Sequence, residues 1–157
     1  RLLPTIRSRC AKLPVRALSD NEVASLLRRY RSGLNEAMIA KLAGMSGGSI
    51  GKAMMYADID AADIYERLCA ILCARDKYEM SAVLELAAEM AGDADKFTVL
   101  QELLLKFIKE NMANCRDAEA LYACWNKTRQ NFADCANINM DKRFMLIKLL
   151  TEICKVL

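Results

Sequence analysis

The two prolines of this chain, Pro4 and Pro14, both lie near its start, and no later proline interrupts a helix. From Ser19 onward apolar residues recur at spacings of three and four, and no segment alternates convincingly in the manner of a β-strand. Ser19 and Glu22 have the spacing of a capping box, in which the serine accepts from the glutamate amide and the glutamate side chain reaches back. The sequence therefore predicts an all-α protein.

Two groups of helices are expected. Three short helices come first, spanning Ser19–Tyr30, Asn35–Gly44 and Ser49–Ala57. Five longer helices follow, with these apolar positions expected inward: Ile64, Leu68, Ile71 and Leu72; Met80, Val83, Leu84, Ala87 and Met90; Phe97, Leu100, Leu104, Phe107 and Ile108; Leu121, Tyr122, Trp125, Thr128 and Phe132; Phe144, Ile147, Leu150 and Ile153. Tyr122, Trp125 and Phe132 are interpreted as core residues rather than as a stacking platform. Asp117 and Asn139 are expected to cap the last two helices.

The first eighteen residues do not share this pattern. Pro4 allows a short turn, and Ala11–Leu18 could form one extended strand. A single strand needs a partner, and the rest of this chain offers none. The chain also begins at Arg1 without a methionine. We therefore expect a piece of a longer protein, whose start is the last part of a sheet formed upstream.

Charge is unevenly distributed along the chain. The net charge of +3 argues against general nucleic-acid binding, yet residues 1–31 contain eight basic and two acidic residues. Such a segment either contacts phosphates or is simply solvated. No apolar run approaches the ~20 residues that a membrane-spanning helix requires, and the first residues do not resemble a signal peptide. The sequence predicts a protein without a membrane partner.

The seven cysteines include no Cys-x-x-Cys pair, and the chain has no histidine, so no metal site of the usual zinc spacing is expected. The usual general base for a serine or cysteine nucleophile is also missing. Cys69 and Cys73 are four residues apart on an expected helix and should share its buried face. This usage is typical of reduced core thiols in a cytoplasmic protein.

The stretch Ile39–Met54 has the spacing of a helix-turn-helix, with Ala40 at the helix crossing, Gly44 in the turn and Ile50 in the core. Its second helix, however, contains interior glycines and offers Lys52 as the one strong base contact. Glycines at 47, 48 and 51 better suit a backbone that closely approaches another surface. A DNA-binding regulator therefore remains an alternative, but not the first choice.

A more specific motif lies before this stretch, at residues 2–10. Leu2-Leu-Pro-Thr-Ile-Arg-Ser-Arg-Cys10 resembles the Ser-Arg-Cys motif of the bacterial AAA+ clamp-loader family. The resemblance implies an order of parts: residues 1–18 end the nucleotide-binding domain, 19–58 form a three-helix lid, and 59–157 form a helical collar that oligomerises. Ala136-Asn-Ile-Asn139 is also similar to C-terminal regions of this family.

The resemblance also implies site residues. Within the motif Ser8, Arg9 and Cys10, it assigns Arg9 the role of an arginine finger that acts in trans on a neighbouring subunit's ATP. Arg7 receives no definite role. Gly51 stands where ATP-hydrolysing members carry the sensor-2 arginine of a Gly-Ser-x-Arg pattern, so the lid should not grip a γ-phosphate. The resemblance thus points to a non-hydrolysing member that scaffolds the loader.

This chain contains no Gly-x-x-x-x-Gly-Lys-Ser/Thr loop, so it is not expected to be an enzyme by itself or to hold a cofactor. ATP and magnesium would belong to the neighbouring subunit. The implied partners are the gamma/tau and delta subunits through the collar, with the sliding clamp and primed DNA contacted indirectly, in the bacterial cytoplasm. The alternatives are the ATP-hydrolysing gamma/tau subunit itself and the helix-turn-helix regulator.

Overall fold

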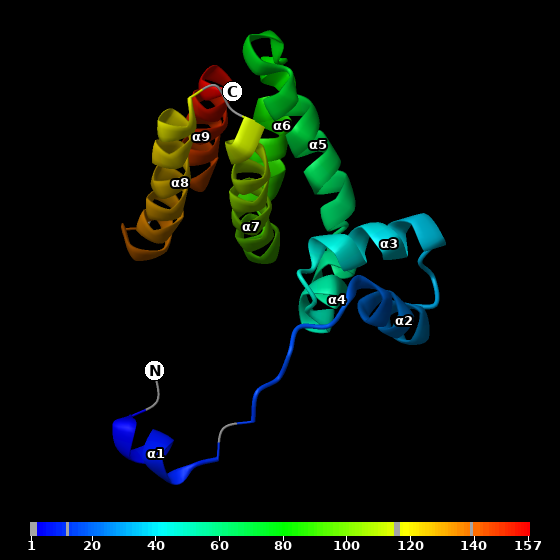
Figure 1. The fold of residues 1–157 in the computed structure, drawn as a ribbon. Coiled ribbons are helices and arrows are strands. Elements are labelled where there is room, and N and C mark those ends of the chain that lie inside the picture. Colours follow the sequence, from blue (N-terminus) through cyan, green and yellow to red (C-terminus); the bar gives the residue numbers. More distant parts are fainter. Residues whose placement is uncertain (1–2, 12, 115–116, 139) are drawn as a thin grey trace. The chain divides into compact units, whose positions relative to one another are not determined.

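The computed structural model describes residues 3–11, 13–114, 117–138 and 140–157. Within these ranges the secondary structure is helical and no strand occurs, which confirms the all-α prediction. The elements are α1 (Pro4–Arg9), α2 (Asp20–Tyr30), α3 (Glu36–Met45), α4 (Ile50–Asp58), α5 (Ala61–Cys73), the 3-10 helix η1 (Arg75–Lys77), α6 (Met80–Ala91), α7 (Ala94–Asn111), the 3-10 helix η2 (Met112–Asn114), α8 (Ala118–Ile138) and α9 (Lys142–Val156) (Figure 1). The chain divides into two compact units, Arg1–Met54 and Met55–Leu157, and the division falls inside α4.

In the smaller unit, α2 and α3 pack against each other. The predicted capping box is confirmed: the Ser19 side chain accepts from the Glu22 amide, and the Glu22 carboxylate accepts from the Ser19 amide. Asn35 caps α3 by accepting from the Met38 amide at 2.7 Å. The buried side chains of this helix pair are Val23, Ala24, Leu27, Ile39, Leu42, Ala43 and Met45.

The expected strand and the expected end of the second short helix have different outcomes. Residues 11 and 13–18 are in no strand here, and their pairing with strands outside this chain stays a prediction. Gly44 does not end α3, which continues to Met45. The left-handed backbone that follows a helix is supplied later, by Gly47 at φ +60° and Gly48 at φ +79°.

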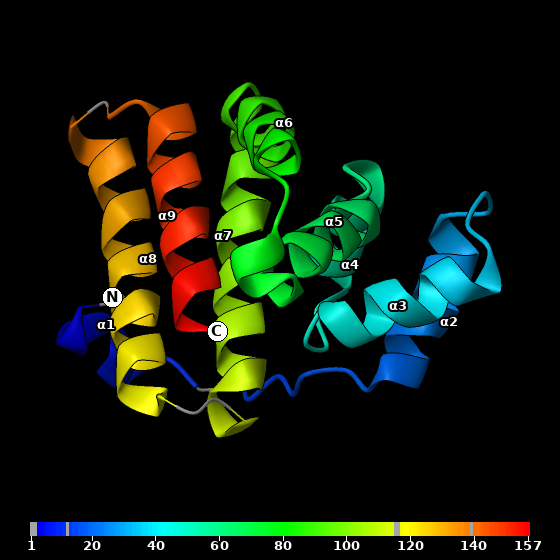
Figure 2. The same ribbon diagram turned by 90° about the horizontal axis from the view of Figure 1, so that it is seen from above.

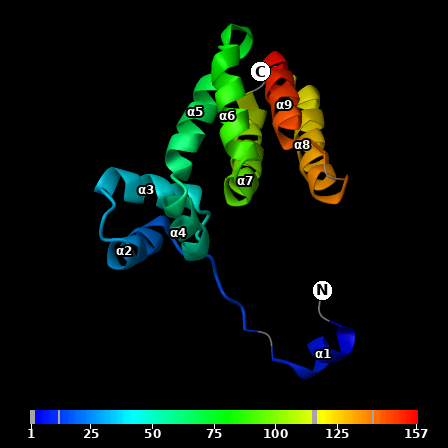
Figure 3. The same ribbon diagram turned by 180° about the vertical axis from the view of Figure 1, so that it is seen from behind.

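The larger unit contains the five long helices, α5 to α9. Helices that follow one another along the chain run in opposite directions, as the colour gradient along each ribbon shows (Figure 1). α8 packs against both α7 and α9, and Figure 2 shows it beside α9. α6 packs against α5, α7 and α9 (Figure 3). α9 also contacts α5, where the Cys154 thiol donates to the Ile71 carbonyl at 3.7 Å.

The core of this bundle is built from large aliphatic side chains. Leu68 and Leu72 of α5, Leu86 and Met90 of α6, and Leu100, Leu104 and Ile108 of α7 are all fully buried. α8 contributes Leu121, Thr128 and Phe132, and α9 contributes Leu146, Leu149, Leu150 and Ile153. Two tyrosine hydroxyls join other helices to α7: Tyr56, which is buried, donates to Glu102 at 2.7 Å, and Tyr65 donates to Glu110 at 2.8 Å.

The buried face of α9 differs in part from the predicted one. Leu150 and Ile153 are buried as predicted, but Phe144 is 67% exposed, and Met145, Leu146 and Leu149 are buried. Apolar residues occupy positions 144–147 in succession, so their spacing left two possible faces, and the face without Phe144 packs inward. Asp141 caps this helix by accepting from the Phe144 amide at 3.0 Å, in place of the predicted Asn139, which lies outside the described residues. Asp117 caps α8 as predicted, by accepting from the Ala120 amide at 2.9 Å.

Other expected core positions lie at the surface. Met80, Leu84 and Tyr122 are 46%, 38% and 54% exposed. Cys69 is half-buried and Cys73 is exposed, so they do not share a buried face; among the described cysteines, Cys135 and Cys154 are the buried ones. Within the described residues, no helix combines the length and apolar character needed to cross a bilayer.

Candidate functional site

Arg9, the predicted arginine finger, is the last residue of α1, and its side chain is exposed. The Ser8 hydroxyl donates to the Thr5 carbonyl at 3.0 Å, which ties the motif into the helix. Cys10 follows in extended backbone and is exposed. The side chain of Arg7 lies outside the described residues. Arg9 thus presents an exposed, permanently charged guanidinium at the end of a short helix.

The segment that follows the motif is fixed to the smaller unit at residues 16–19. Arg16 makes two hydrogen bonds to the Glu22 carboxylate, at 3.0 and 2.6 Å. The Ser19 amide donates to the same carboxylate at 2.8 Å. These bonds to Arg16 and Ser19 stabilise the ionised form and lower the pKa of Glu22 to about 2. The guanidinium and the capping box therefore form one connected polar cluster.

Gly48 holds the same segment from its other side. The Leu18 amide donates to the Gly48 carbonyl at 3.0 Å. A Cβ added to Gly48 would lie 2.4 Å from the Leu18 carbonyl oxygen and 2.9 Å from the Ala17 Cβ, and its φ of +79° disfavours other residues. The expectation that these glycines permit a close backbone approach is confirmed at Gly48. The surface it approaches is the chain's own residues 17 and 18.

Gly51, the degenerate sensor-2 position, has no such constraint. It is exposed in the first turn of α4, and an added Cβ would meet a single atom, the Ser49 Oγ at 4.0 Å. Its φ does not lie in the left-handed region. Neither the space around a Cβ nor the backbone geometry therefore requires a glycine at this position.

The helix-turn-helix spacing does not produce the helix contacts of that motif. Gly44 lies inside α3 rather than in the turn, and an added Cβ there would meet nothing within 4 Å. Ala40, expected at a tight helix crossing, is exposed. Lys52 is exposed, and α4 carries no other cation. The small residues of this stretch are therefore not used to bring two helices together.

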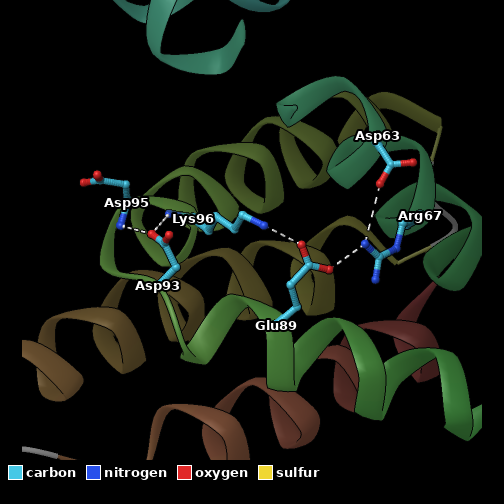
Figure 4. Close-up of polar contacts among 6 residues, drawn as sticks. All are labelled: Asp63, Arg67, Glu89, Asp93, Asp95 and Lys96. Atoms are coloured by element: carbon cyan, nitrogen blue, oxygen red, sulfur yellow. Dashed lines mark hydrogen bonds and ion pairs between the residues drawn. The ribbon is translucent and has the colours of Figure 1, made fainter. Parts of the chain in front are cut away.

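The larger unit contains a charged cluster that the sequence analysis did not predict (Figure 4). The Glu89 carboxylate of α6 accepts from Arg67 of α5 at 2.7 Å and from Lys96 of α7 at 2.6 Å. Asp63 lies 3.5 Å from Arg67, one turn away on α5. Asp93 caps α7 by accepting from the amides of Asp95 and Lys96 at 2.8 and 3.0 Å. One carboxylate thus joins three helices.

This cluster is suited to holding the bundle together rather than to acid–base chemistry. Hydrogen bonds from Lys96 and Arg67 lower the pKa of Glu89, so its carboxylate is a poor base at neutral pH. No group of three or more potential metal ligands occurs in the part of the chain that the structure describes. A groove of about 300 Å³ is lined by Arg67 and three alanines together with charged residues that include Lys77 and Glu85.

α8 carries an aromatic stack at the surface. The rings of Tyr122 and Trp125 lie 6.1 Å apart at an interplanar angle of 12°, and the Arg129 guanidinium lies 4.8 Å from the Trp125 ring centre. The prediction that these aromatics are core residues is wrong for Tyr122 and correct for Phe132. The spacing is helical in either case, so periodicity alone could not decide which side faces inward.

Comparison of the chain with protein-family profiles, with curated proteins and with solved structures found no match. The assignment of these sites therefore depends on the motif and on the geometry described above.

Proposed function

We propose that this chain is part of a non-hydrolysing subunit of the bacterial DNA polymerase III clamp loader, equivalent to delta-prime. The observation that carries the proposal is an order of features along the chain. The motif Ser8-Arg9-Cys10 precedes three short helices, and five antiparallel helices follow. Gly51 replaces the arginine that would contact a nucleotide in an ATP-hydrolysing member.

In this proposal residues 19–58 form the lid, and residues 59–157 form the collar through which the loader pentamer assembles. The gamma/tau and delta subunits are the direct partners, and the sliding clamp and primed DNA are served indirectly. ATP and magnesium occupy the neighbouring subunit. The helices of the larger unit have buried apolar faces and a charged margin, which suits a rigid scaffold.

Arg9 is the residue that, in this proposal, takes part in ATP hydrolysis by a neighbouring subunit. A guanidinium presents donors in a planar fork that matches two oxygens of a phosphate, and it stays charged throughout the reaction. Placed beside a neighbouring subunit's ATP, it offsets the charge that develops on the transferred phosphoryl group. In GTPases such a finger accelerates hydrolysis by ~10³–10⁵-fold. The exposed position of Arg9 at the end of α1 leaves its guanidinium accessible to a partner.

The first test is assembly. The chain is mixed with the same organism's gamma/tau and delta subunits and analysed by size-exclusion chromatography with light scattering. We expect co-elution as a complex of defined mass. The chain eluting alone in the presence of both subunits would overturn the proposal. Binding to one particular duplex sequence in preference to others, without these subunits, would favour the helix-turn-helix regulator instead.

The second test concerns Arg9. In a reconstituted loader, Arg9→Ala should lower clamp-stimulated ATP hydrolysis at least tenfold without changing assembly. Arg9→Lys is the matched control, because it keeps the charge and loses the planar fork, and it should restore little activity. ATP hydrolysis that does not change in either variant would remove the finger role. Hydrolysis by this subunit itself would favour the gamma/tau alternative.

A further inference from the structure

The two units of the chain carry net charges of opposite sign, and the positive one is the smaller unit. Residues 1–54 contain ten basic and three acidic residues, a net charge of +7, whereas residues 55–157 contain thirteen basic and seventeen acidic residues, a net charge of −4. A polyanion is therefore attracted to the smaller unit and repelled by the larger one. The aromatic stack of α8 belongs to the acidic unit, which makes it the weaker candidate for such a ligand.

Within the smaller unit, three consecutive residues at the end of α2 combine charge with an exposed aromatic ring: Arg28, Arg29 and Tyr30. We refer to these residues as the α2 basic end. The Arg29 guanidinium lies 5.6 Å from the centre of the Tyr30 ring, and Tyr30 is 57% exposed. Arg28 is held by a bidentate pair with Glu36, 2.7 Å at its shortest.

The helix dipole explains part of this arrangement. Basic residues in the last turn and acidic residues in the first turn both stabilise a helix, and α2 has Asp20 and Glu22 at its start. The dipole does not explain why a tyrosine ring lies exposed beside an arginine. Glu22 lies eight residues before Tyr30, about 12 Å along the helix, so it does not neutralise this end.

We propose that the α2 basic end binds single-stranded nucleic acid, with Arg29 contacting a phosphate and Tyr30 stacking on a base. Proteins that bind single strands combine cationic side chains with aromatic rings on which the bases stack. Arg28, whose charge is already paired, positions the last turn of α2. The contact is independent of sequence, which distinguishes it from helix-turn-helix recognition. It does not rest on the proposed loader function, because it requires no partner subunit.

The test is fluorescence anisotropy of a labelled oligo-dT with the full chain at salt concentrations from 50 to 200 mM. We expect binding that weakens linearly on a logarithmic salt axis. Tyr30→Ala should weaken binding between about fivefold and a hundredfold, and Tyr30→Phe should retain it because the ring remains. Arg29→Gln should weaken binding and reduce the steepness of the salt dependence.

Arg16→Gln is the matched control for Arg29→Gln, because it removes one positive charge at the start of α2 from a residue paired with Glu22. It should change binding less than Arg29→Gln does, and circular dichroism confirms that each variant is folded. Equal effects of the two variants would overturn the proposal, since only net charge would then matter. Absence of binding at 50 mM salt would also overturn the proposal. Equally strong competition by polyglutamate would overturn it too, because it would identify an acidic protein as the better ligand. Failure here leaves assembly with the gamma/tau and delta subunits intact, so the two proposals fail separately.

Discussion

The two units of this chain are stabilised in different ways. Of the described residues, the smaller unit buries eight hydrophobic side chains and the larger unit buries twenty-seven, although it is less than twice as long. The smaller unit depends instead on caps, exposed ion pairs and a backbone contact at Gly48. Helical periodicity in the sequence therefore does not decide how a unit is stabilised: one unit is a packed bundle, and the other depends on interactions between residues near its helix ends.

The largest effect should come from the core of the bundle. Leu104 of α7 is fully buried, and Leu104→Ala should lower the free energy of unfolding by about 4 kcal/mol, because it removes apolar contacts and leaves a cavity. Leu42→Ala in the smaller unit should cost about 2 kcal/mol, since the few side chains around it can close the gap. Chemical denaturation followed by circular dichroism measures both.

Leu84→Ala provides the matched control for this comparison. Leu84 is 38% exposed, so the same substitution should cost about 1 kcal/mol or less. Equal losses for Leu104→Ala and Leu42→Ala would show that the two cores respond alike, and the contrast between the units would then have to be abandoned.

The next effect should come from the backbone of the smaller unit. Gly48→Ala should destabilise it by about 2 kcal/mol or more, because a Cβ would approach the Leu18 oxygen to 2.4 Å at a φ of +79°. Gly47→Ala, at φ +60° with nothing within 4 Å, isolates the cost of the backbone conformation, about 1 kcal/mol. Gly51→Ala should stabilise α4 by about 0.5–1 kcal/mol. Thermal unfolding should rank the three variants in this order, and a neutral Gly48→Ala would contradict the role given to the Leu18 contact.

Sequence reasoning succeeded where the controlling interaction is local. The Ser19–Glu22 capping box and the Asp117 cap each depend on residues a few positions apart. It failed where burial depends on distant partners. Phe144 is exposed because α9 turns a neighbouring aliphatic face inward, and the spacing of apolar residues allowed either face.

The same distinction applies to the candidate sites. Close approach at Gly48 was predictable, but its partner, Leu18, was not, because the two residues are thirty positions apart. The cluster around Glu89 joins three helices through side chains that each look like ordinary surface charges in the sequence. The role of Arg9 depends on a motif and on a partner subunit, so it stays a prediction.

The third effect tests whether polar contacts matter in the bundle as they do in the smaller unit. Glu89→Gln should lower the stability of the larger unit by about 1 kcal/mol at neutral pH, because it weakens the pairs with Lys96 and Arg67 at a partly exposed site. Since these partners lower the pKa of Glu89, the stability that its charge contributes is present above the ordinary pKa and is lost as the pH falls below it. Wild-type stability should therefore decrease more steeply in acid than that of Glu89→Gln. Parallel pH profiles would assign the acid sensitivity to other carboxylates.

The smallest effect should be the acid response of the capping box. Hydrogen bonds from Arg16 and Ser19 lower the pKa of Glu22 from an ordinary value of 4.5 to about 2. Its contribution to stability is therefore complete above pH 4.5 and is lost as the pH falls toward 2. An NMR titration should place the midpoint of the Glu22 carboxyl near pH 2, and Arg16→Gln should move it upward because the largest single cause of the shift is removed.

A midpoint near 4.5 in the wild type would mean that the start of α2 is held by the serine cap and the Gly48 contact, and that the exposed Arg16 guanidinium adds nothing. In that case the smaller unit would rely on its backbone even more strongly than the comparison with the bundle already implies.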